Sequence, residues 1–311
     1  MVALSTLLPV LFMVVLGFIS RVKEFISPEQ KEGANSIVFH VLFPILIFNI
    51  LFTSKIESSA FLIVLYVFII FSLAILFGKL LERFTGKRFS HISNFMLTTC
   101  EGGNVALPLY TSIVGVAYAS NTVIFDLAGT LIAFVVIPII VAKKSAGNTT
   151  VSELAKRIFS NSFVIAVILG LVLNFLGVYE MILHSEFIDI YTNVISTATA
   201  PIVGMILFII GYNLKINLDM FGSLLRLLVV RVLFYICVIA GFFLLFPDLM
   251  AEQTYLIAVV IYFMCPTGFA LPMQITPLYK SKDDASFTSA FISLNMLITL
   301  VVYAWVVVFI A

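Results

Sequence analysis

The chain has 311 residues and a net charge of +1 at pH 7, and 62% of its residues are hydrophobic while only 11% are charged. Soluble proteins average roughly 45–50% apolar and about 25% charged residues. This composition therefore excludes a soluble globular domain, a disordered chain and a nucleic-acid-binding protein. Several apolar runs also exceed about 18 residues, the length of a membrane-spanning helix. The sequence predicts an all-α polytopic protein in a lipid bilayer.

Ten apolar runs follow one another along the chain, each close to the roughly 20 residues that one transmembrane helix requires. They cover residues 3–20, 33–53, 59–80, 90–117, 120–142, 158–178, 186–212, 221–246, 253–279 and 285–310. With these spans, 16 of the 17 Lys and Arg residues fall on one side of the membrane and only Lys55 falls on the other. Because cytoplasmic loops are enriched in Lys and Arg, we expect both termini to face away from the cytoplasm.

The two halves of the chain carry similar short motifs in the same order. The pairs are Val15-Leu16-Gly17 with Ile168-Leu169-Gly170, Pro44 with Pro201, and Cys100–Pro108 with Cys265–Pro272. This order favours duplication. Because five spans is an odd number, the second copy must be inverted in the membrane, as in many secondary transporters. We expect one five-helix repeat over residues 1–150 and an inverted repeat over 151–311.

Spans 4 and 9 carry glycine and proline near their middle, at equivalent places in the two halves. The residues expected to break these helices are Gly102, Gly103, Pro108, Pro266 and Pro272. Within a bilayer, broken backbone is tolerated only where it is buried in protein or lines a cavity. Paired interruptions therefore indicate a binding site at the midplane, although two ordinary proline kinks are the alternative. We expect the first half-helices to end near Glu101 and Met264, and the second to begin near Leu109 and Met273.

The ends of broken helices offer two kinds of ligand. The N-termini of the second half-helices suit a carboxylate, whereas Glu101 is expected at a carbonyl end, against the helix dipole. A charge near the bilayer centre costs at least about 2.5–3.5 kcal/mol, so Glu101 needs a compensating cation. We predict that Glu101 binds the coupling ion, a sodium ion or a proton, with supporting oxygen ligands from Asn104 and Thr267. A protonated structural glutamate is the alternative, and no other cofactor is expected.

Other side chains complete the predicted site. Asp126 in span 5 is either a second coupling group or a solvated residue of the outer cavity. Arg231 in span 8 is expected to extend toward the membrane interface, although attraction of an anionic substrate or pairing with a carboxylate is the alternative. Asp283 and Asp284 are assigned to a charged loop. We expect the substrate to contact Asn104, Val105, Leu109, Thr267, Gly268, Phe269 and Asn295.

The interrupted spans resemble those of the auxin efflux carrier family, which is related to the bile-acid/sodium symporters. The family's span 4 typically reads Asn-Thr-Gly-Phe-Ile-Gly-Leu-Pro, where this chain has Glu-Gly-Gly-Asn-Val-Ala-Leu-Pro at 101–108. Plant members carry Pro-Gln-Gly-Ile-Val-Pro in span 9, which is similar to Pro-Thr-Gly-Phe-Ala-Leu-Pro at 266–272. Pro44, Ala200-Pro201 and Gly211 also fit the family, and the resemblance covers the whole chain.

The resemblance implies a division of the ten spans between a scaffold domain (spans 1, 2, 6 and 7) and a transport domain (spans 3–5 and 8–10). It also implies crossing of the two broken helices, an elevator-like motion, and a homodimer formed through the scaffold. Known substrates of the family are small organic anions, among them auxin, malate and malonate. The short loop at 143–157 resembles bacterial members, so we expect the bacterial inner membrane.

From these features we predict a secondary active transporter of small carboxylates, coupled to sodium or protons through Glu101. The family has Asn at this place, so an uncoupled, potential-driven efflux carrier is the main alternative. A channel requires a ring of carbonyls or charges, which the chain does not offer, and no HExxH zinc motif points to a membrane enzyme. We therefore expect neither a channel nor an enzyme, and no nucleic-acid partner.

Overall fold

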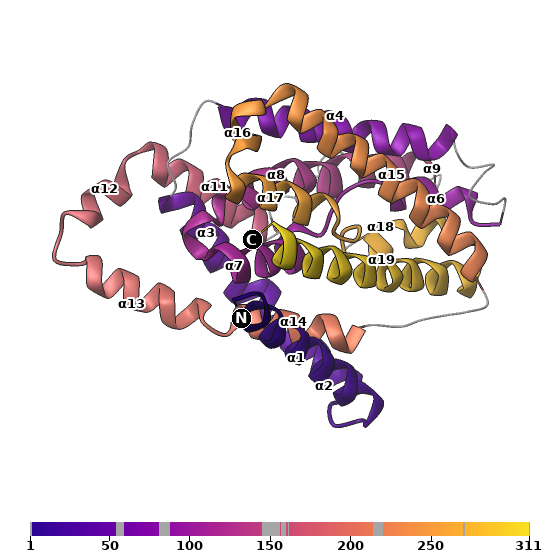
Figure 1. Cartoon of the computed structure of the whole chain (residues 1–311), viewed down its shortest axis with the longest axis horizontal. Helices are drawn as coiled ribbons and strands as arrows, with labels where there is room; N and C mark the ends of the chain where they lie inside the picture. The colour runs from indigo at the N-terminus through magenta and orange to yellow at the C-terminus, as the bar shows by residue number, and fades with distance from the viewer. Residues whose placement is uncertain are drawn as a thin grey trace. The chain divides into compact units, whose positions relative to one another are not determined.

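The computed structural model describes residues 2–53, 59–80, 88–144, 156, 160, 162–213, 220–269 and 271–310. Within these ranges every regular element is a helix and no strand occurs, which confirms the predicted all-α class (Figure 1). Five of the described helical stretches are long and apolar enough to cross a membrane, and further apolar helices are shorter. The five are Pro28–Thr53, Ala60–Leu80, Ile188–Asn213, Phe221–Leu245 and Lys282–Phe309. The full set of ten spans in an inverted repeat stays a prediction.

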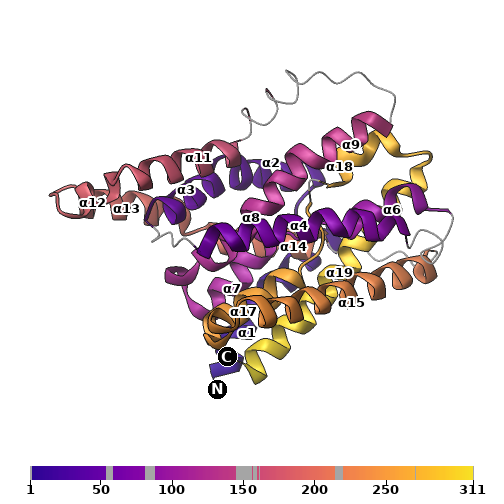
Figure 2. The same cartoon turned by 90° about the horizontal axis from the view of Figure 1, so that it is seen from above.

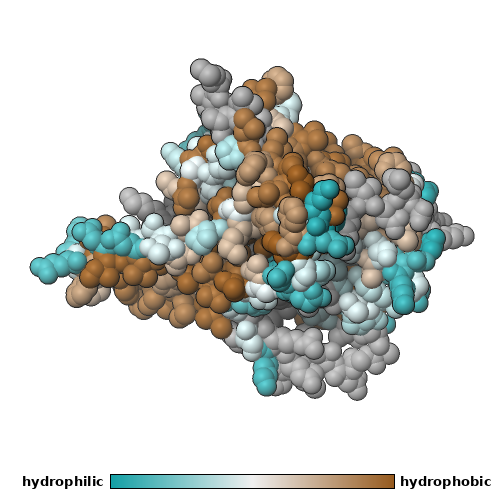
Figure 3. Space-filling model, turned by 90° about the horizontal axis from the view of Figure 1, so that it is seen from below, coloured by the Kyte–Doolittle hydropathy of each residue, from teal (hydrophilic) through white to brown (hydrophobic). Residues whose placement is uncertain are grey.

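Large apolar side chains cover much of the outer surface. Phe61, Leu80 and Leu244 are 72%, 79% and 82% exposed. In Figure 3, brown hydrophobic groups cover broad areas of one face, and teal hydrophilic groups gather in separate patches. Exposed apolar surface of this extent marks a protein or membrane interaction surface. The described helices therefore support a multi-pass membrane protein.

The chain divides into two compact units. Unit 1 contains Met1–Leu7, Ser59–Leu154 and Leu214–Ala311, and unit 2 contains Leu8–Ser58 and Ala155–Asn213. Apart from its first residues, the first predicted span lies in unit 2, together with the second, sixth and seventh. The other six spans lie in unit 1.

Glycines set the closest helix contacts within unit 2. Its helices are α1 (Val2–Val22, from Leu8 on), α2 (Pro28–Ile37), η1 (Val38–Leu42), α3 (Phe43–Thr53), α11 (Ser162–Phe175), α12 (Val178–Leu183), α13 (Ile188–Thr199) and α14 (Ile202–Asn213). A Cβ atom on Gly17 of α1 would lie 2.8 Å from the backbone nitrogen of Tyr212 in α14. A Cβ atom on Gly170 of α11 would lie 3.0 Å from the backbone oxygen of Phe48 in α3. The two echoed glycines thus pack the first span against the seventh and the sixth against the second.

Three π-helical turns precede three prolines, and proline chemistry explains them. The turns are η1, η2 (Gly102–Ala106) and η4 (Ile132–Val136), and each ends two residues before Pro44, Pro108 or Pro138. A proline in a helix lacks an N–H group, and its ring clashes with the carbonyl four residues earlier. Widening the preceding turn is one way in which a helix takes up such a disruption. The helices therefore continue through these prolines.

Unit 1 surrounds two interrupted helices with longer ones. Its elements are α4 (Ser59–Leu80), α6 (Ser90–Met96), η2, α7 (Leu107–Val114), η3 (Val116–Tyr118), α8 (Ser120–Leu131), η4, α9 (Ile137–Lys144), α15 (Phe221–Leu245), α16 (Pro247–Ala251), α17 (Gln253–Phe263), α18 (Leu271–Ile275), η5 (Thr276–Leu278) and α19 (Lys282–Phe309). Figure 2 shows α4 running beside α8, with which it makes extensive contact. Phe125 of α8, Phe242 of α15 and Phe263 of α17 form ring pairs with centroids 5.3 to 5.7 Å apart. Such pairs add to the stability gained from burial and join three helices around the core.

Substitution of Gly17 tests the close contact between α1 and α14. We expect Gly17→Ala to destabilise the protein by about 1–3 kcal/mol, because the new methyl group would force two backbones apart. Gly33→Ala is the matched control, since within the described ranges no atom from outside its own stretch of α2 lies within 4 Å of its Cβ position. Thermal unfolding in detergent compares the two variants, and equal midpoints for them would contradict the assigned packing.

Candidate functional site

The first interruption lies in the fourth predicted span, but not where the sequence predicts it. Helix α6 ends at Met96, and η2 begins at Gly102 and continues as α7. The unwound segment is therefore 97–101, and it contains Thr99 with a φ of 54°, an uncommon value for a residue other than glycine. Pro108 lies inside the second half-helix, because the π-turn of η2 accommodates it. The expectation that Pro108 breaks this helix is wrong, and Gly102 and Gly103 begin the second half instead.

The second interruption lies in the ninth predicted span. Helix α17 ends at Phe263, in agreement with the expected end near Met264, and α18 begins at Leu271. Pro266 lies in the segment between them, as expected of a residue that breaks the helix. Pro272 is the second residue of α18, a position where proline is tolerated because the first N–H groups of a helix have no partner within it. It follows the break and does not cause it.

The two unwound segments bind each other through backbone and threonine groups. The N–H group of Glu101 donates to the carbonyl oxygen of Pro266 at 2.7 Å. The Thr267 hydroxyl donates to the carbonyl oxygen of Thr98 at 2.8 Å, and its oxygen lies 3.3 Å from that of the Thr99 hydroxyl. These bonds satisfy backbone groups that lost their helical partners, as the interior of a bilayer requires.

Glu101 lies at the start of a helix and not at the end of one. It is the N-cap residue of η2, its exposed fraction is only 8%, and its carboxylate accepts from the Asn104 side-chain amide and from the N–H group of Phe269. A negative charge is stabilised at a helix N-terminus. The expectation that Glu101 opposes the helix dipole is therefore wrong, because the first half-helix ends five residues earlier, at Met96.

Asp126 approaches the same helix N-terminus from α8. Its carboxyl group faces the backbone N–H groups of Gly102 and Gly103 and accepts a hydrogen bond from the Tyr262 hydroxyl at 3.2 Å. A Cβ atom on Gly102 would collide with this carboxyl group and would lie 2.7 Å from the Tyr262 ring. The absence of a side chain at Gly102 is what allows two carboxyl groups to meet one N-terminus.

Arg231 does not extend to the membrane interface. It is only 1% exposed, and its guanidinium group donates to the carbonyl oxygens of Met96, Thr99 and Cys265 at 2.8 to 3.0 Å. Met96 is the last residue of α6, and Thr99 and Cys265 lie in the unwound segments that follow α6 and α17. The sequence indicated neither these partners nor Tyr262, because no local motif links them to the broken spans.

The remaining predicted site residues lie on several elements of unit 1. Val105 and Leu109 are fully buried in η2 and α7, and Gly268 donates its N–H group to the Thr99 hydroxyl oxygen at 3.4 Å. Asn295 in α19 is 2% exposed, and its Nδ2 atom has no hydrogen-bond partner among the described residues. Thr299, one turn further along α19, donates to the carbonyl oxygen of Met264 at 2.7 Å. Residues four apart lie on the same face of a helix, so the Asn295 amide lies on the face of α19 from which Thr299 bonds to Met264.

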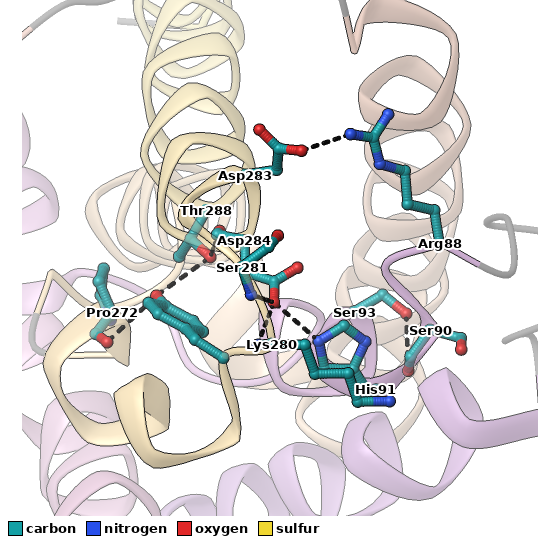
Figure 4. A network of polar contacts seen from close by, with 11 residues as sticks. Arg88, Ser90, His91, Ser93, Pro272, Lys280, Ser281, Asp283, Asp284 and Thr288 are labelled. Atoms are coloured by element: carbon teal, nitrogen blue, oxygen red, sulfur yellow. Dashed lines mark hydrogen bonds and ion pairs between the residues drawn. The ribbon is translucent and has the colours of Figure 1, made fainter.

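A second polar cluster lies where α19 begins (Figure 4). Asp283 and Asp284, expected in a loop, form the first turn of the helix, and Asp284 makes a capping box with Ser281. The Asp284 carboxylate accepts from the N–H group of Lys280 at 2.6 Å and lies 3.0 Å from Nε2 of His91 in α6. This cluster joins the first turns of α6 and α19.

One comparison with known proteins carries information on this chain. A family model described as "Membrane transport protein" matches residues 2–306, nearly the whole sequence. No curated protein matches it. Among the described residues, no group of three or more His, Cys, Asp or Glu side chains is arranged to hold a metal ion.

Substitution of Asp284 tests the cluster at the start of α19. We expect Asp284→Ala to destabilise the protein by about 0.5–2 kcal/mol, because the capping carboxylate is lost. The control is Asp283→Ala, which removes only an exposed ion pair with Arg88, worth about 0–1 kcal/mol. The midpoint of thermal unfolding in detergent measures both, and a larger loss for the Asp283 variant would contradict this assignment.

Proposed function

The chain belongs to the auxin efflux carrier family of membrane transport proteins, and on this premise we propose that it is a secondary active transporter of small organic anions. In this proposal a carboxylate crosses the membrane together with a cation, either a sodium ion or a proton. Glu101 is the group through which the two are coupled. Malate and auxin-like aromatic acids are the substrate types to test first.

One observation carries the proposal. The Glu101 carboxylate accepts hydrogen bonds from donor groups that would also suit the carboxylate of a substrate. Its oxygens accept from the Phe269 N–H group, which lies just before α18, and from the Asn104 amide. Donors of this kind at helix N-termini bind carboxylates readily. An incoming anion and the ionised Glu101 would compete for the same groups.

Binding of a cation to Glu101 relieves this competition. A proton on the carboxyl group, or a sodium ion beside it, neutralises the charge and weakens its hold on the two donors. The substrate carboxylate then accepts from Phe269 N–H and Asn104, and the unpartnered Asn295 amide offers a further donor. In this proposal the substrate also contacts residues of the two interrupted helices, namely Val105, Leu109, Thr267 and Gly268. Cation and anion thus favour each other's binding, which is the requirement for symport.

Asp126 is the second coupling group in this proposal. Its carboxyl group faces the N-terminus of η2, where Glu101 is the N-cap residue. Two carboxylates at one helix end repel each other, so a cation that neutralises either one also stabilises its neighbour. This pair supports coupling over the uncoupled, potential-driven carrier, which is the competing outcome of the experiment below.

The two compact units support an elevator-type motion. Unit 1 contains both interrupted helices, whereas unit 2 consists of the segments expected to form the scaffold. We propose that unit 1 carries the substrate across the membrane while unit 2 stays fixed. In this proposal two copies of the chain form a homodimer through unit 2 in the bacterial inner membrane, and both termini lie outside the cytoplasm. Alternating access of this kind, by motion of one part against another around a site, is common in transporters built on broken helices.

Glu101→Gln tests the coupling directly. The variant keeps the shape of the side chain but carries no charge, so we expect carboxylate transport to continue while its dependence on sodium or pH is lost. Currents from proteoliposomes on a solid-supported membrane, with malate and indole-3-acetate and with or without sodium and a pH step, measure this. Glu180→Gln, at an exposed position in unit 2, is the control and should behave as the wild type.

Each other result has a defined meaning. If the Glu101 variant still follows the sodium or proton gradient, Glu101 is not the coupling residue. Wild-type current that ignores both ions would instead indicate the uncoupled carrier. No current with any acid would contradict anion transport and direct attention to cationic substrates.

A further inference from the structure

Arg231 carries a charge that the proposed transport steps do not use. It lies near the middle of α15, a helix long and apolar enough to span the membrane, and it is only 1% exposed. Charged side chains within transmembrane segments are costly and persist where they pair with other groups or serve a function. Its partners therefore indicate what it does.

Those partners are backbone carbonyls from both interrupted helices. The guanidinium group donates to the oxygens of Met96 at 2.9 Å and Thr99 at 2.8 Å from the first, and to that of Cys265 at 3.0 Å from the second. The last carbonyls of a helix lack internal partners and form the negative end of its dipole. One side chain thus satisfies the last carbonyl of α6 and one carbonyl in each unwound segment, with donors arranged in a planar fork.

Tyr235, one turn further along α15, supports this arrangement. Its hydroxyl donates to the carbonyl oxygen of Leu97 at 2.9 Å, and the Arg231 guanidinium carbon lies 4.6 Å from the centre of its ring. A cation over an aromatic face is attracted to it, more strongly when water is excluded. The aromatic ring and the carbonyls together account for the burial of the charge, since among the described residues no carboxylate forms an ion pair with Arg231.

We propose that Arg231 is a permanent cation built into the crossing, a positioning residue that holds both unwound segments where the site requires them. In transporters with broken helices, unwound carbonyls and half-helix C-termini commonly coordinate the coupling cation. Here the guanidinium group of Arg231 already binds the carbonyl oxygens of Met96, Thr99 and Cys265. The coupling cation must then bind elsewhere, on the side of Glu101 and Asp126, and this consequence rests on the proposed function.

Arg231→Ala with added guanidinium tests the proposal by chemical rescue. The substitution removes three charged hydrogen bonds to buried carbonyl oxygens, and we expect the unfolding midpoint in detergent to fall by roughly 10 °C. Guanidinium ion at millimolar concentration should restore most of this loss, whereas urea, its neutral analogue, should not. Arg231→Lys should fall between the wild type and the alanine variant, because lysine keeps the charge but not the planar fork.

The matched control lies on the same helix. Arg226 is exposed and, among the described residues, donates to the carbonyl oxygen of Gly222 in its own helix, so Arg226→Ala should keep the wild-type midpoint and show no guanidinium response. The proposal is overturned if Arg231→Ala unfolds at the wild-type midpoint, or if guanidinium and urea restore it equally or not at all.

Transport of the same samples separates this proposal from the proposed function. Wild-type currents should be unchanged by guanidinium, whereas those of Arg231→Ala should fall at least about tenfold and recover with it, as loss of a charged hydrogen bond at a site implies. If stability is rescued but no carboxylate current occurs even in the wild type, the positioning role stands and the proposed function fails. A wild-type current that Arg231→Ala retains in full would overturn the positioning role alone.

Discussion

The arrangement of unit 1 depends on one requirement, that two stretches of unwound backbone find hydrogen-bond partners away from water. The segments after Met96 and Phe263 lose their helical partners, and in hydrocarbon each unsatisfied group is costly. The two segments provide some of these partners for each other, as in the hydrogen bond from the Glu101 N–H group to the Pro266 carbonyl oxygen. The donors of Arg231, Tyr235 and Thr299 satisfy further carbonyls.

This requirement also separates positive and negative groups within the crossing. The last carbonyl of α6 and a carbonyl of the segment after α17 face the Arg231 guanidinium, whereas Glu101 is the N-cap residue of η2 and the Asp126 carboxyl group faces the same N-terminus. Each charged group therefore lies at the helix end of opposite sign. The charged side chains of this region are thus held by groups of the protein itself; under the proposed function, a substrate carboxylate would have to displace Glu101 from its donors.

Small residues and prolines allow these close approaches. Gly102 leaves the space in which the Asp126 carboxyl group meets the helix end, and Gly17 does the same for two helix backbones in unit 2. Pro44, Pro108 and Pro138 each follow a widened turn, so the chain keeps its direction through them. Glycine thus sets where elements touch, and proline here changes the helix type without ending the helix.

Composition and the order of glycine and proline along the chain are local properties, and they were enough to predict the helical class, the membrane environment and the two interrupted regions. The sequence also identified Glu101, Asn104 and Phe269, which the structure brings together. It misplaced the break relative to Pro108 and misjudged Arg231. Both points depend on the packing of the folded chain, since the partners of Arg231 lie up to 135 residues away along the sequence. Hydrogen bonds between distant segments follow from how helices pack, and no local pattern records them.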